Sequence, residues 1–259
     1  MATKYPIILV HGVALKDIRF FKAFGNIEKL LSHAGYTVST APTDGFGSIE
    51  SNAEQLQAYV EKILAEANAE KVNLIAHSKG GLDSRYMIDK LGMKDKIASV
   101  TFLCTPHKGS GVASLLYELP KPTKGFIASW INLWYRLFGD KHPDALTVCR
   151  QLKYAPDGAL EHAEDYEGIF LQSYTTVMEK GRDDFVMSIP LRFSRRYEND
   201  ESDGMVTVHS AKFGEYRGHC TDGSVSHSEI VDFMVKENKK EKIYLFYLSL
   251  CEELGERGY

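Results

Sequence analysis

Apolar and polar positions alternate regularly along the first part of the chain. A short apolar run bounded by turn residues predicts a buried strand, and apolar residues spaced three and four apart predict a helix. The pattern predicts strands at 7–10, 36–40, 72–76 and 97–104, and helices at 20–34, 49–67 and 80–91. Because strands and helices alternate, we expect an α/β protein with a mostly parallel sheet and helices on both faces.

The pattern changes after the fourth predicted strand. Residues 106–167 are helical and loop-rich and contain several prolines, which predicts an insertion into the sheet. Later in the chain we expect strands at 169–177 and 215–220, a polar loop at 183–203, and helices beginning near residues 228 and 241. Since no linker divides the chain, we expect a single domain over residues 1–259, with 106–167 as a helical lid or cap.

A serine stands between a predicted strand and a predicted helix, in the run Ala76-His77-Ser78-Lys79-Gly80. A nucleophile elbow has this layout, because a sharp turn from strand to helix lifts the serine hydroxyl clear of the sheet. The residues two before and two after the serine must be small to avoid a collision, and here they are alanine and glycine. The sequence therefore predicts Ser78 as a nucleophile, against the alternative of an ordinary turn serine.

A serine nucleophile needs a histidine as base and a carboxylate that orients the histidine. Enzymes with this elbow place the three in the chain order serine, acid, histidine. His227 begins a predicted amphipathic helix, and Asp203 precedes it beside a glycine that permits a sharp turn. We therefore predict Asp203 as the acid and His227 as the base. The alternatives left open are Asp200 and Glu201 for the acid and His209 and His219 for the base.

The oxyanion formed during acyl transfer needs two backbone N–H donors that are already in position. The residue after the nucleophile, Lys79, supplies one of them. The loop after the first strand, His11-Gly12-Val13, places a permissive glycine before the second donor, which we predict to be Val13. An ordinary turn at the end of the strand is the alternative interpretation of His11 and Gly12.

One helix of the insertion is strongly amphipathic. Apolar residues recur at helical spacing between residues 124 and 140, and both tryptophans of the chain, Trp130 and Trp134, lie among them. Tryptophan suits a surface that is alternately buried and exposed to water. We therefore predict that Trp130 and Trp134 line an acyl pocket beneath a lid. The alternatives are packing on the core and a transient contact with a lipid interface.

The overall composition narrows the possible partners. The net charge of the 259 residues is -4 and there is no long run of lysine or arginine, so we expect no nucleic acid partner. The longest apolar stretch, at 243–251, is much shorter than the ~20 residues of a membrane span. We therefore expect no stable insertion into a membrane.

Cysteine usage and the start of the sequence bear on cofactors and location. The four cysteines are scattered without a Cys-x-x-Cys spacing, which favours reduced thiols over a zinc site or a disulfide framework. No motif implies a redox cofactor. The sequence as written begins without an export signal, so we expect a cytoplasmic protein, or a secreted one if a leader has been removed.

Together these motifs resemble those of the bacterial true lipases, the triacylglycerol lipases of the α/β-hydrolase superfamily. The blocks that carry the resemblance are 10–13, 72–81, 105–110 and 202–206. The resemblance implies the α/β-hydrolase fold and a lipid-like ester substrate. The site residues that it implies are Ser78, Asp203, His227, Val13 and Lys79, in agreement with the residues derived above.

Some features depart from that family. One large branch holds a calcium ion near the catalytic histidine, but the corresponding ligand positions here are Glu229 and Phe233. The same branch has a cysteine six residues past the acid, where this chain has His209. Another branch carries a zinc-binding insertion, for which the segment 81–104 has no matching cluster. We therefore expect no bound metal.

The sequence thus predicts a serine carboxylester hydrolase that cleaves esters of apolar acyl chains through an acyl-enzyme. An acyltransferase, a thioesterase or an amidase with the same triad is an alternative, because only the leaving group and the acceptor distinguish them. A second alternative is a catalytically silent lipid-binding protein that keeps the fold.

Overall fold

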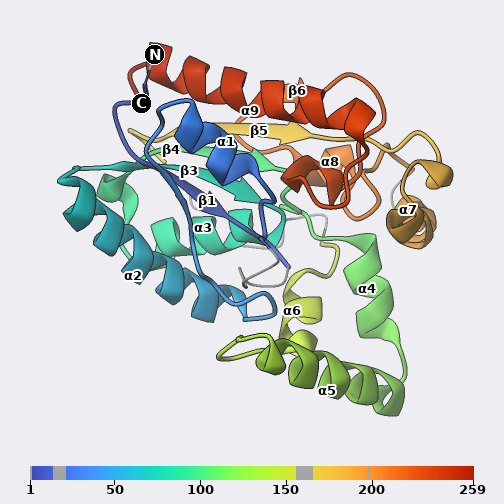
Figure 1. Cartoon of the computed structure of the whole chain (residues 1–259). Helices are drawn as coiled ribbons and strands as arrows, with labels where there is room; N and C mark the ends of the chain where they lie inside the picture. Colours follow the sequence, from blue (N-terminus) through green and yellow to red (C-terminus); the bar gives the residue numbers. More distant parts are fainter. Residues whose placement is uncertain (1, 14–21, 156–165, 198) are drawn as a thin grey trace.

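A parallel sheet lies at the centre of the computed structural model, which describes residues 2–13, 22–155, 166–197 and 199–259 (Figure 1). The strands are β1 (Ile7–Val10), β2 (Val38–Thr40), β3 (Val72–His77), β4 (Ile97–Leu103), β5 (Phe170–Thr175) and β6 (Glu215–His219). All neighbouring strands are parallel, in the order β2-β1-β3-β4-β5-β6. The predicted strands are therefore confirmed, with small differences at their ends.

Helices cover both faces of this sheet (Figure 1). Those on one face are α2 (Ile49–Ala67) and α3 (Lys79–Lys90), and those on the other are α1 (Ile27–His33) and α9 (Glu237–Glu256). Side chains of β1 alternate between two apolar clusters: Ile8 and Val10 belong to the cluster with α2, whereas Ile7 and Leu9 belong to the cluster with α9. Because both clusters are buried, the strand is apolar at every position.

Sequence signals account for both ends of α2, which has the predicted bounds. The side chain of Ser48 accepts a hydrogen bond from the N–H of Ser51 at 3.2 Å and caps the first turn. Asn68 ends the helix in a left-handed conformation with φ 48°. The helix predicted at 20–34 is shorter, since α1 begins only at Ile27, and residues 20 and 21 lie outside the described residues.

Three further helices lie beyond the carboxyl ends of the strands, away from the sheet (Figure 1). These covering helices are α4 (Gly111–Glu118), α5 (Lys121–Leu137) and α6 (Ala145–Gln151). The amphipathic helix predicted at 124–140 is α5, which begins earlier and takes Pro122 into its first turn. A proline is compatible with that turn because no backbone N–H is needed there.

Two predictions for the last third of the chain are wrong. The polar loop expected at 183–203 contains the helix α7 (Phe185–Tyr197), with Pro190 inside it. The charged residues toward the ends of this segment are typical of a loop, and Pro190 removes only one backbone hydrogen bond from the helix of 13 residues. The helix expected near residue 228 is a single 3-10 turn, η3 (Glu229–Val231), because Asp232 adopts a left-handed conformation with φ 61°. The remaining short helices are η1 (Lys94–Lys96), η2 (Gly181–Asp183) and α8 (Val208–Ala211).

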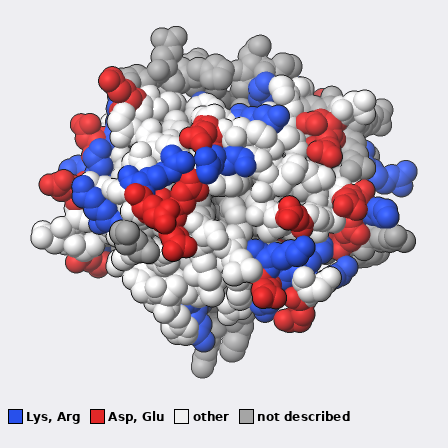
Figure 2. Space-filling model, turned by 90° about the horizontal axis from the view of Figure 1, so that it is seen from above, with Lys and Arg blue, Asp and Glu red and all other residues white. Residues whose placement is uncertain are grey.

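Charged side chains of both signs are interspersed on the face seen from above, over α9 (Figure 2). Such a mixture is typical of a solvated protein surface. Within the described ranges, no helix combines the length and the apolar character needed to cross a membrane.

Candidate active site

Ser78 is the residue that joins β3 to α3. Its backbone has φ 55° and ψ -132°, a conformation that costs a residue with a Cβ about 1–3 kcal/mol and that clusters at functional sites. The N–H of Ser78 donates to the carbonyl oxygen of Leu103 on β4 at 2.9 Å, which fixes the turn to the sheet. Ser78 therefore has the strained backbone that a nucleophile elbow requires.

Two glycines let the loop after β1 lie directly against this elbow. A Cβ on Gly12 would stand 2.5 Å from the Cβ of Ser78 and 2.9 Å from the backbone nitrogen of Lys79. A Cβ on Gly80 would stand 2.5 Å from the carbonyl oxygen of His11. Since such distances are too short for a real side chain, glycine is required at both positions.

The structure brings Ser78, Asp203 and His227 together from three separate parts of the chain. His227 Nε2 lies 2.9 Å from Ser78 Oγ, and His227 Nδ1 lies 2.6 Å from Asp203 Oδ2. The other carboxylate oxygen of Asp203 accepts the N–H groups of Met205 and Val206 at 2.9 and 2.8 Å. Because the carboxylate only accepts, Nδ1 of His227 carries the proton and Nε2 is free to accept the Ser78 hydroxyl.

The alternative acids and bases lie elsewhere. His219 is exposed on the edge strand β6, and His209 is exposed with its Nε2 2.7 Å from Nζ of Lys108. Glu201 is exposed, and Asp200 accepts hydrogen bonds from backbone N–H groups near it. None of these four belongs to the described residues that border the cavity at Ser78.

His77 is the last residue of β3, and its ring lies against that of His227. Its ring centre is 4.5 Å from that of His227, and the side chain is buried. Burial, and then the charge of His227, hold the pKa of His77 well below its usual range. His77 is therefore neutral at physiological pH and adds no positive charge beside the imidazole of His227.

The two predicted oxyanion donors belong to backbone segments that meet at the elbow. Lys79 begins α3, so its N–H is one of the unpaired donors at the positive end of the helix. Val13 follows Gly12, which touches Ser78, and Val13 borders the cavity. The arrangement can hold an oxyanion between the first strand and the elbow.

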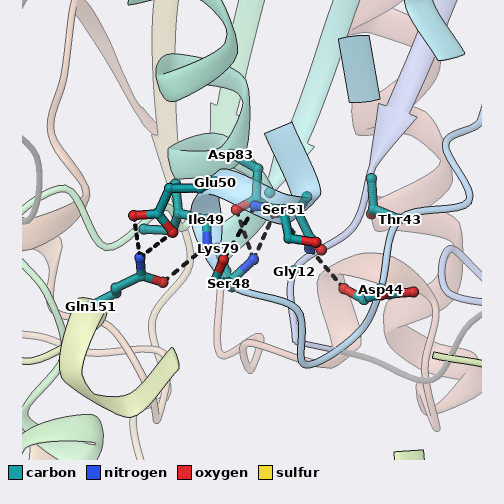
Figure 3. Close-up of polar contacts among 12 residues, drawn as sticks. Gly12, Thr43, Asp44, Ser48, Ile49, Glu50, Ser51, Lys79, Asp83 and Gln151 are labelled. Atoms are coloured by element: carbon teal, nitrogen blue, oxygen red, sulfur yellow. Dashed lines mark hydrogen bonds and ion pairs between the residues drawn. The ribbon is translucent and has the colours of Figure 1, made fainter. Parts of the chain in front are cut away.

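The side chain of Lys79 forms a buried ion pair that our sequence analysis missed. Its Nζ lies 2.7 and 2.9 Å from the carboxylate oxygens of Asp83, one turn along α3, and both side chains are fully buried (Figure 3). Asn52 donates a further hydrogen bond to Asp83 at 3.1 Å. Burial raises the pKa of Asp83 to about 6 even beside the ammonium group, so the cost of desolvation exceeds the attraction of the pair. The i,i+4 spacing of lysine and aspartate is the signal that could have revealed it.

An apolar cavity of about 350 Å³ opens beside Ser78. Its walls come from the loops at the carboxyl ends of the strands and from the covering helices. Apolar and aromatic residues in these walls include Phe46, Val112, Leu116, Tyr135, Val148 and Met205. A concave apolar site with a few polar groups at one end is typical of small-molecule binding sites.

The structure does not bring Trp130 and Trp134 into this cavity. Both lie on the outer face of α5 and are 60% and 55% exposed. Tyr135 borders the cavity instead and packs edge-on against Phe46, with ring centres 4.5 Å apart. The predicted lining by the two tryptophans is therefore corrected, because helical spacing reveals an apolar stripe but not the direction in which the stripe faces.

Reciprocal hydrogen bonds attach the covering helices to the rest of the domain. The carboxylate of Asp140, just after α5, accepts the backbone N–H groups of residues 45 and 46 at 3.0 and 2.8 Å. The carboxylate of Asp44 accepts those of residues 141 and 142 at 3.0 and 2.9 Å. Gln151 in α6 reaches the first turn of α2, where it bonds to Ile49 and Glu50 (Figure 3).

A cysteine lies behind the triad. Sγ of Cys104, a carboxylate oxygen of Asp203 and a ring nitrogen of His227 lie within 4.8 Å of one another, the one group with metal-site spacing among the residues described. Burial, and then the Asp203 charge, raise the pKa of the Cys104 thiol well above its usual value. A protonated thiol does not bind a metal, and the other two residues already bond to each other. All four cysteines are free, as the sequence indicated.

The sequence also matches a known protein family. Residues 6–142, more than half of the chain, match the family model of palmitoyl protein thioesterases. The chain belongs to the palmitoyl protein thioesterase family. The region shared with the palmitoyl protein thioesterase family includes Gly12, the elbow at Ser78 and the helix α5, whereas Asp203 and His227 lie beyond it.

Curated relatives of the chain include proteins named triacylglycerol lipases. The lipase of Pseudarthrobacter phenanthrenivorans is 40% identical over 169 residues, which cover 60% of this chain and 52% of the relative. Triacylglycerol lipase 2 of Saccharomyces cerevisiae is 29% identical over 257 residues, which cover 90% of this chain and 73% of the relative. The chain spans about half the length of the first relative. The resemblance to triacylglycerol lipases is confirmed.

A solved structure shows the same fold. The mature form of a Bacillus licheniformis lipase matches with a TM-score of 0.66 and 20% identity, over 98% of this chain and 93% of that one. At this identity the likeness concerns the fold. The predicted α/β-hydrolase fold is therefore confirmed for this member of the palmitoyl protein thioesterase family.

Proposed function

We propose that the protein is a serine carboxylic ester hydrolase that forms an acyl-enzyme at Ser78. One observation carries this proposal: Ser78, His227 and Asp203 form a hydrogen-bonded series, and Ser78 and His227 border an apolar cavity. The strained backbone at Ser78 adds support, because such strain persists where function requires it. The lipases among the relatives agree with this chemistry.

In this mechanism Ser78 Oγ attacks the carbonyl carbon of the ester while His227 Nε2 takes the hydroxyl proton. Asp203 stabilises the imidazolium through the hydrogen bond from Nδ1. The N–H groups of Val13 and Lys79 hold the oxyanion of the tetrahedral intermediate. His227 then gives the proton to the leaving alcohol oxygen as the carbon–oxygen bond breaks, and an acyl-enzyme remains. A water molecule, deprotonated by His227, releases the acid and restores Ser78.

The apolar walls of the cavity favour an ester of an apolar acyl chain, that is, a lipid-like substrate. An acyl chain buried there gains about 25 cal/mol per Å² of apolar surface removed from water. In this proposal the segment 106–167, of which 156–165 lie outside the described residues, is the cap of the cavity, and the outer face of α5 rests transiently on a lipid interface. The exposed apolar residues of that face are Phe126, Trp130, Leu133, Trp134 and Leu137.

The thioester is the second substrate class that the comparisons support, because the family model is that of palmitoyl protein thioesterases. The same triad cleaves a thioester, whose leaving group is a thiol. We therefore propose oxyesters as substrates and treat thioesters as the alternative to be measured.

Two measurements test the proposal. A fluorophosphonate probe followed by peptide mass spectrometry is expected to label Ser78 in the wild type and to label nothing in Ser78→Ala. Turnover of p-nitrophenyl esters from acetate to palmitate, beside an acyl thioester of matched chain length, then defines the substrate class. A folded protein that binds fatty acids but neither reacts with the probe nor cleaves any ester would be a silent lipid binder.

A further inference from the structure

The loop that carries His227 has little regular structure of its own. Only the short turn η3 follows the histidine, and α9 begins later, at Glu237. Side chains from two distant elements bind residues 226–229 instead. One is Asp184, just before α7, and the other is Lys239 in α9.

Lys239 binds the loop through Glu229. Its Nζ lies 2.8 and 2.6 Å from the two carboxylate oxygens of Glu229, and the side chains are only 15% and 3% exposed. Glu229 also accepts the backbone N–H of Ser226 at 2.9 Å. Because the pair is shielded from water, the attraction between its charges is screened less than in an exposed ion pair. Lys239 thus attaches α9 to Glu229, and Glu229 in turn binds Ser226 on the other side of His227.

Asp184, which precedes α7, binds the same loop through two serine hydroxyls. Its Oδ2 accepts the hydroxyl of Ser226 at 2.6 Å and the hydroxyl of Ser228 at 3.1 Å. Its Oδ1 accepts the N–H of Met187 at 3.2 Å, which fixes the carboxylate to the first turn of α7. The hydroxyls of Ser226 and Ser228, which flank His227, therefore donate to the same carboxylate oxygen of Asp184.

The residues of this loop do not fit the calcium ion that one branch of the true lipases holds near the catalytic histidine. The carboxylate oxygens of Glu229 already meet the ammonium group of Lys239, and those of Asp184 already accept hydrogen bonds. The other expected ligand position, Phe233, has no side-chain oxygen, and calcium needs several oxygen ligands. The cation beside this loop is a side chain of the protein itself.

We propose that Lys239 and Asp184 are positioning residues that hold the imidazole of His227 in reach of Ser78. The inference rests on the proposed function, in which His227 is the base. A displacement of a catalytic group by about 1 Å costs on the order of 10²-fold in rate. An ion pair and three hydrogen bonds around residues 226–229 restrict that displacement.

The first test compares variants of one helix. Lys239→Met keeps an unbranched side chain of similar length and removes the charge, and we expect kcat for p-nitrophenyl butyrate to fall about 10- to 100-fold with little change in KM. Lys239→Arg keeps the charge and is expected to restore most of the rate. The matched control is Lys240→Met, because Lys240 lies next to Lys239 and makes only weak contacts among the described residues, a long pair with Glu237 at 3.7 Å and a cation–π contact with Tyr244 at 5.9 Å. Its rate is expected to remain within about twofold of wild type.

Lys239→Met leaves the buried Glu229 without its cation, so a second variant guards against unfolding. Lys239→Met with Glu229→Gln removes both charges and leaves an amide oxygen to accept the N–H of Ser226. We expect it to be folded and to show the same loss of kcat. Asp184→Ala removes the other attachment, and its kcat is expected to fall about 10-fold.

A proton NMR measurement follows the loop without turnover. The proton between His227 and Asp203 is expected to give a low-field resonance that is perturbed in Lys239→Met and normal in Lys239→Arg and Lys240→Met. The proposal is overturned if both Lys239→Met variants keep the wild-type kcat and resonance while only the melting temperature falls. It is also overturned if a chelator abolishes wild-type activity and calcium restores it. A wild type that cleaves no ester contradicts the proposed function instead, and the resonance still tests the loop.

Discussion

The elbow and the covering helices are held to the domain in different ways. At the elbow, backbone meets backbone: the loop at Gly12 touches Ser78, and Gly80 touches the end of β1. The covering helices meet the domain through the side chains of Asp44, Asp140 and Gln151. Their outer face stays exposed, whereas the central strands β1, β3 and β4 are buried on both faces.

This difference assigns two tasks to two regions: the elbow holds the reacting groups, and the covering helices control the entry of substrate. A close backbone contact cannot shift without a clash, so the elbow holds its reacting groups in one geometry. A hydrogen bond to a carboxylate contributes about 1.5–3 kcal/mol and can break and form again. The covering helices are thus suited to admit substrate, and the elbow is suited to orient it. Five changes test this contrast.

The largest effect is expected from Ser78→Ala. Because triad residues act as a unit, we expect esterase turnover to fall on the order of 10⁶-fold in a folded protein. The matched control is Ser129→Ala, since Ser129 lies on α5 and its hydroxyl bonds only to the carbonyl oxygen of Gly125. A purified Ser78→Ala protein with a few per cent of the wild-type rate would show that another residue is the nucleophile.

The buried pair in α3 is expected to give the largest change in stability. Asp83→Leu leaves the buried ammonium of Lys79 unpaired and is expected to lower the free energy of unfolding by about 3–5 kcal/mol. Lys79→Met with Asp83→Leu removes both charges, and we expect its stability to equal or exceed that of the wild type. Denaturant unfolding of the two variants measures this, and a double variant no more stable than the single one would contradict it.

The same pair predicts a pH dependence. The pKa of Asp83 in the folded protein is about 6, above its ordinary value of 3.8. The folded state therefore binds this proton more tightly, so the group lowers stability as pH rises from 3.8 to about 6 and has no further effect above that. The difference in stability between wild type and double variant should show this slope.

A matched pair of glycines tests the steric part of the contrast. Gly12→Ala forces a Cβ to within 2.5 Å of the Cβ of Ser78, and we expect a loss of about 1–3 kcal/mol in stability and on the order of 10² in kcat. Gly125→Ala lies in α5, where a Cβ meets nothing within 4 Å. It is expected to stabilise by about 0.5–1 kcal/mol. Equal effects of the two changes would remove the distinction between the regions.

The attachment of the covering helices is expected to be weaker. Asp140→Ala removes the acceptor of two backbone N–H groups and is expected to cost about 1.5–3 kcal/mol. We also expect the substitution to raise KM more for long-chain esters than for acetate esters, since the covering helices form part of the cavity wall. The control is Asp144→Ala, which removes only the cap of α6. If Asp144→Ala also impaired long-chain esters more than acetate esters, the effect could not be assigned to the attachment at Asp140.

The smallest effect on the soluble protein is expected from the exposed tryptophans. Because Trp130 and Trp134 lie outside the cavity, replacing both with serine should change stability and acetate turnover very little. Binding to phosphatidylcholine vesicles should fall, since aromatic side chains anchor proteins at lipid interfaces. The comparison variant is Tyr135→Leu, which alters the cavity wall. If the tryptophan variant selectively lost turnover of soluble long-chain esters, the two tryptophans would contact the acyl chain after all.

Local sterics explain which parts of the site were predictable. The elbow needs small residues two before and two after Ser78, and that requirement is visible in the sequence. The bounds of α2 were predictable for a similar reason, because Ser48 and its neighbours supply the cap. The helix α7 was missed because the charged residues between Asp183 and Asp203 indicated a polar loop, whereas the tertiary structure accommodates a helix there.

The sequence by itself determined the alternation of strands and helices and the elbow at Ser78, because these depend on neighbouring residues. Only the tertiary structure decided which carboxylate meets His227, since Asp200, Glu201 and Asp203 differ little in sequence but only Asp203 reaches the imidazole. It also decided which side of α5 faces the cavity. Such choices depend on contacts between residues far apart in the chain, which local patterns can favour but cannot decide.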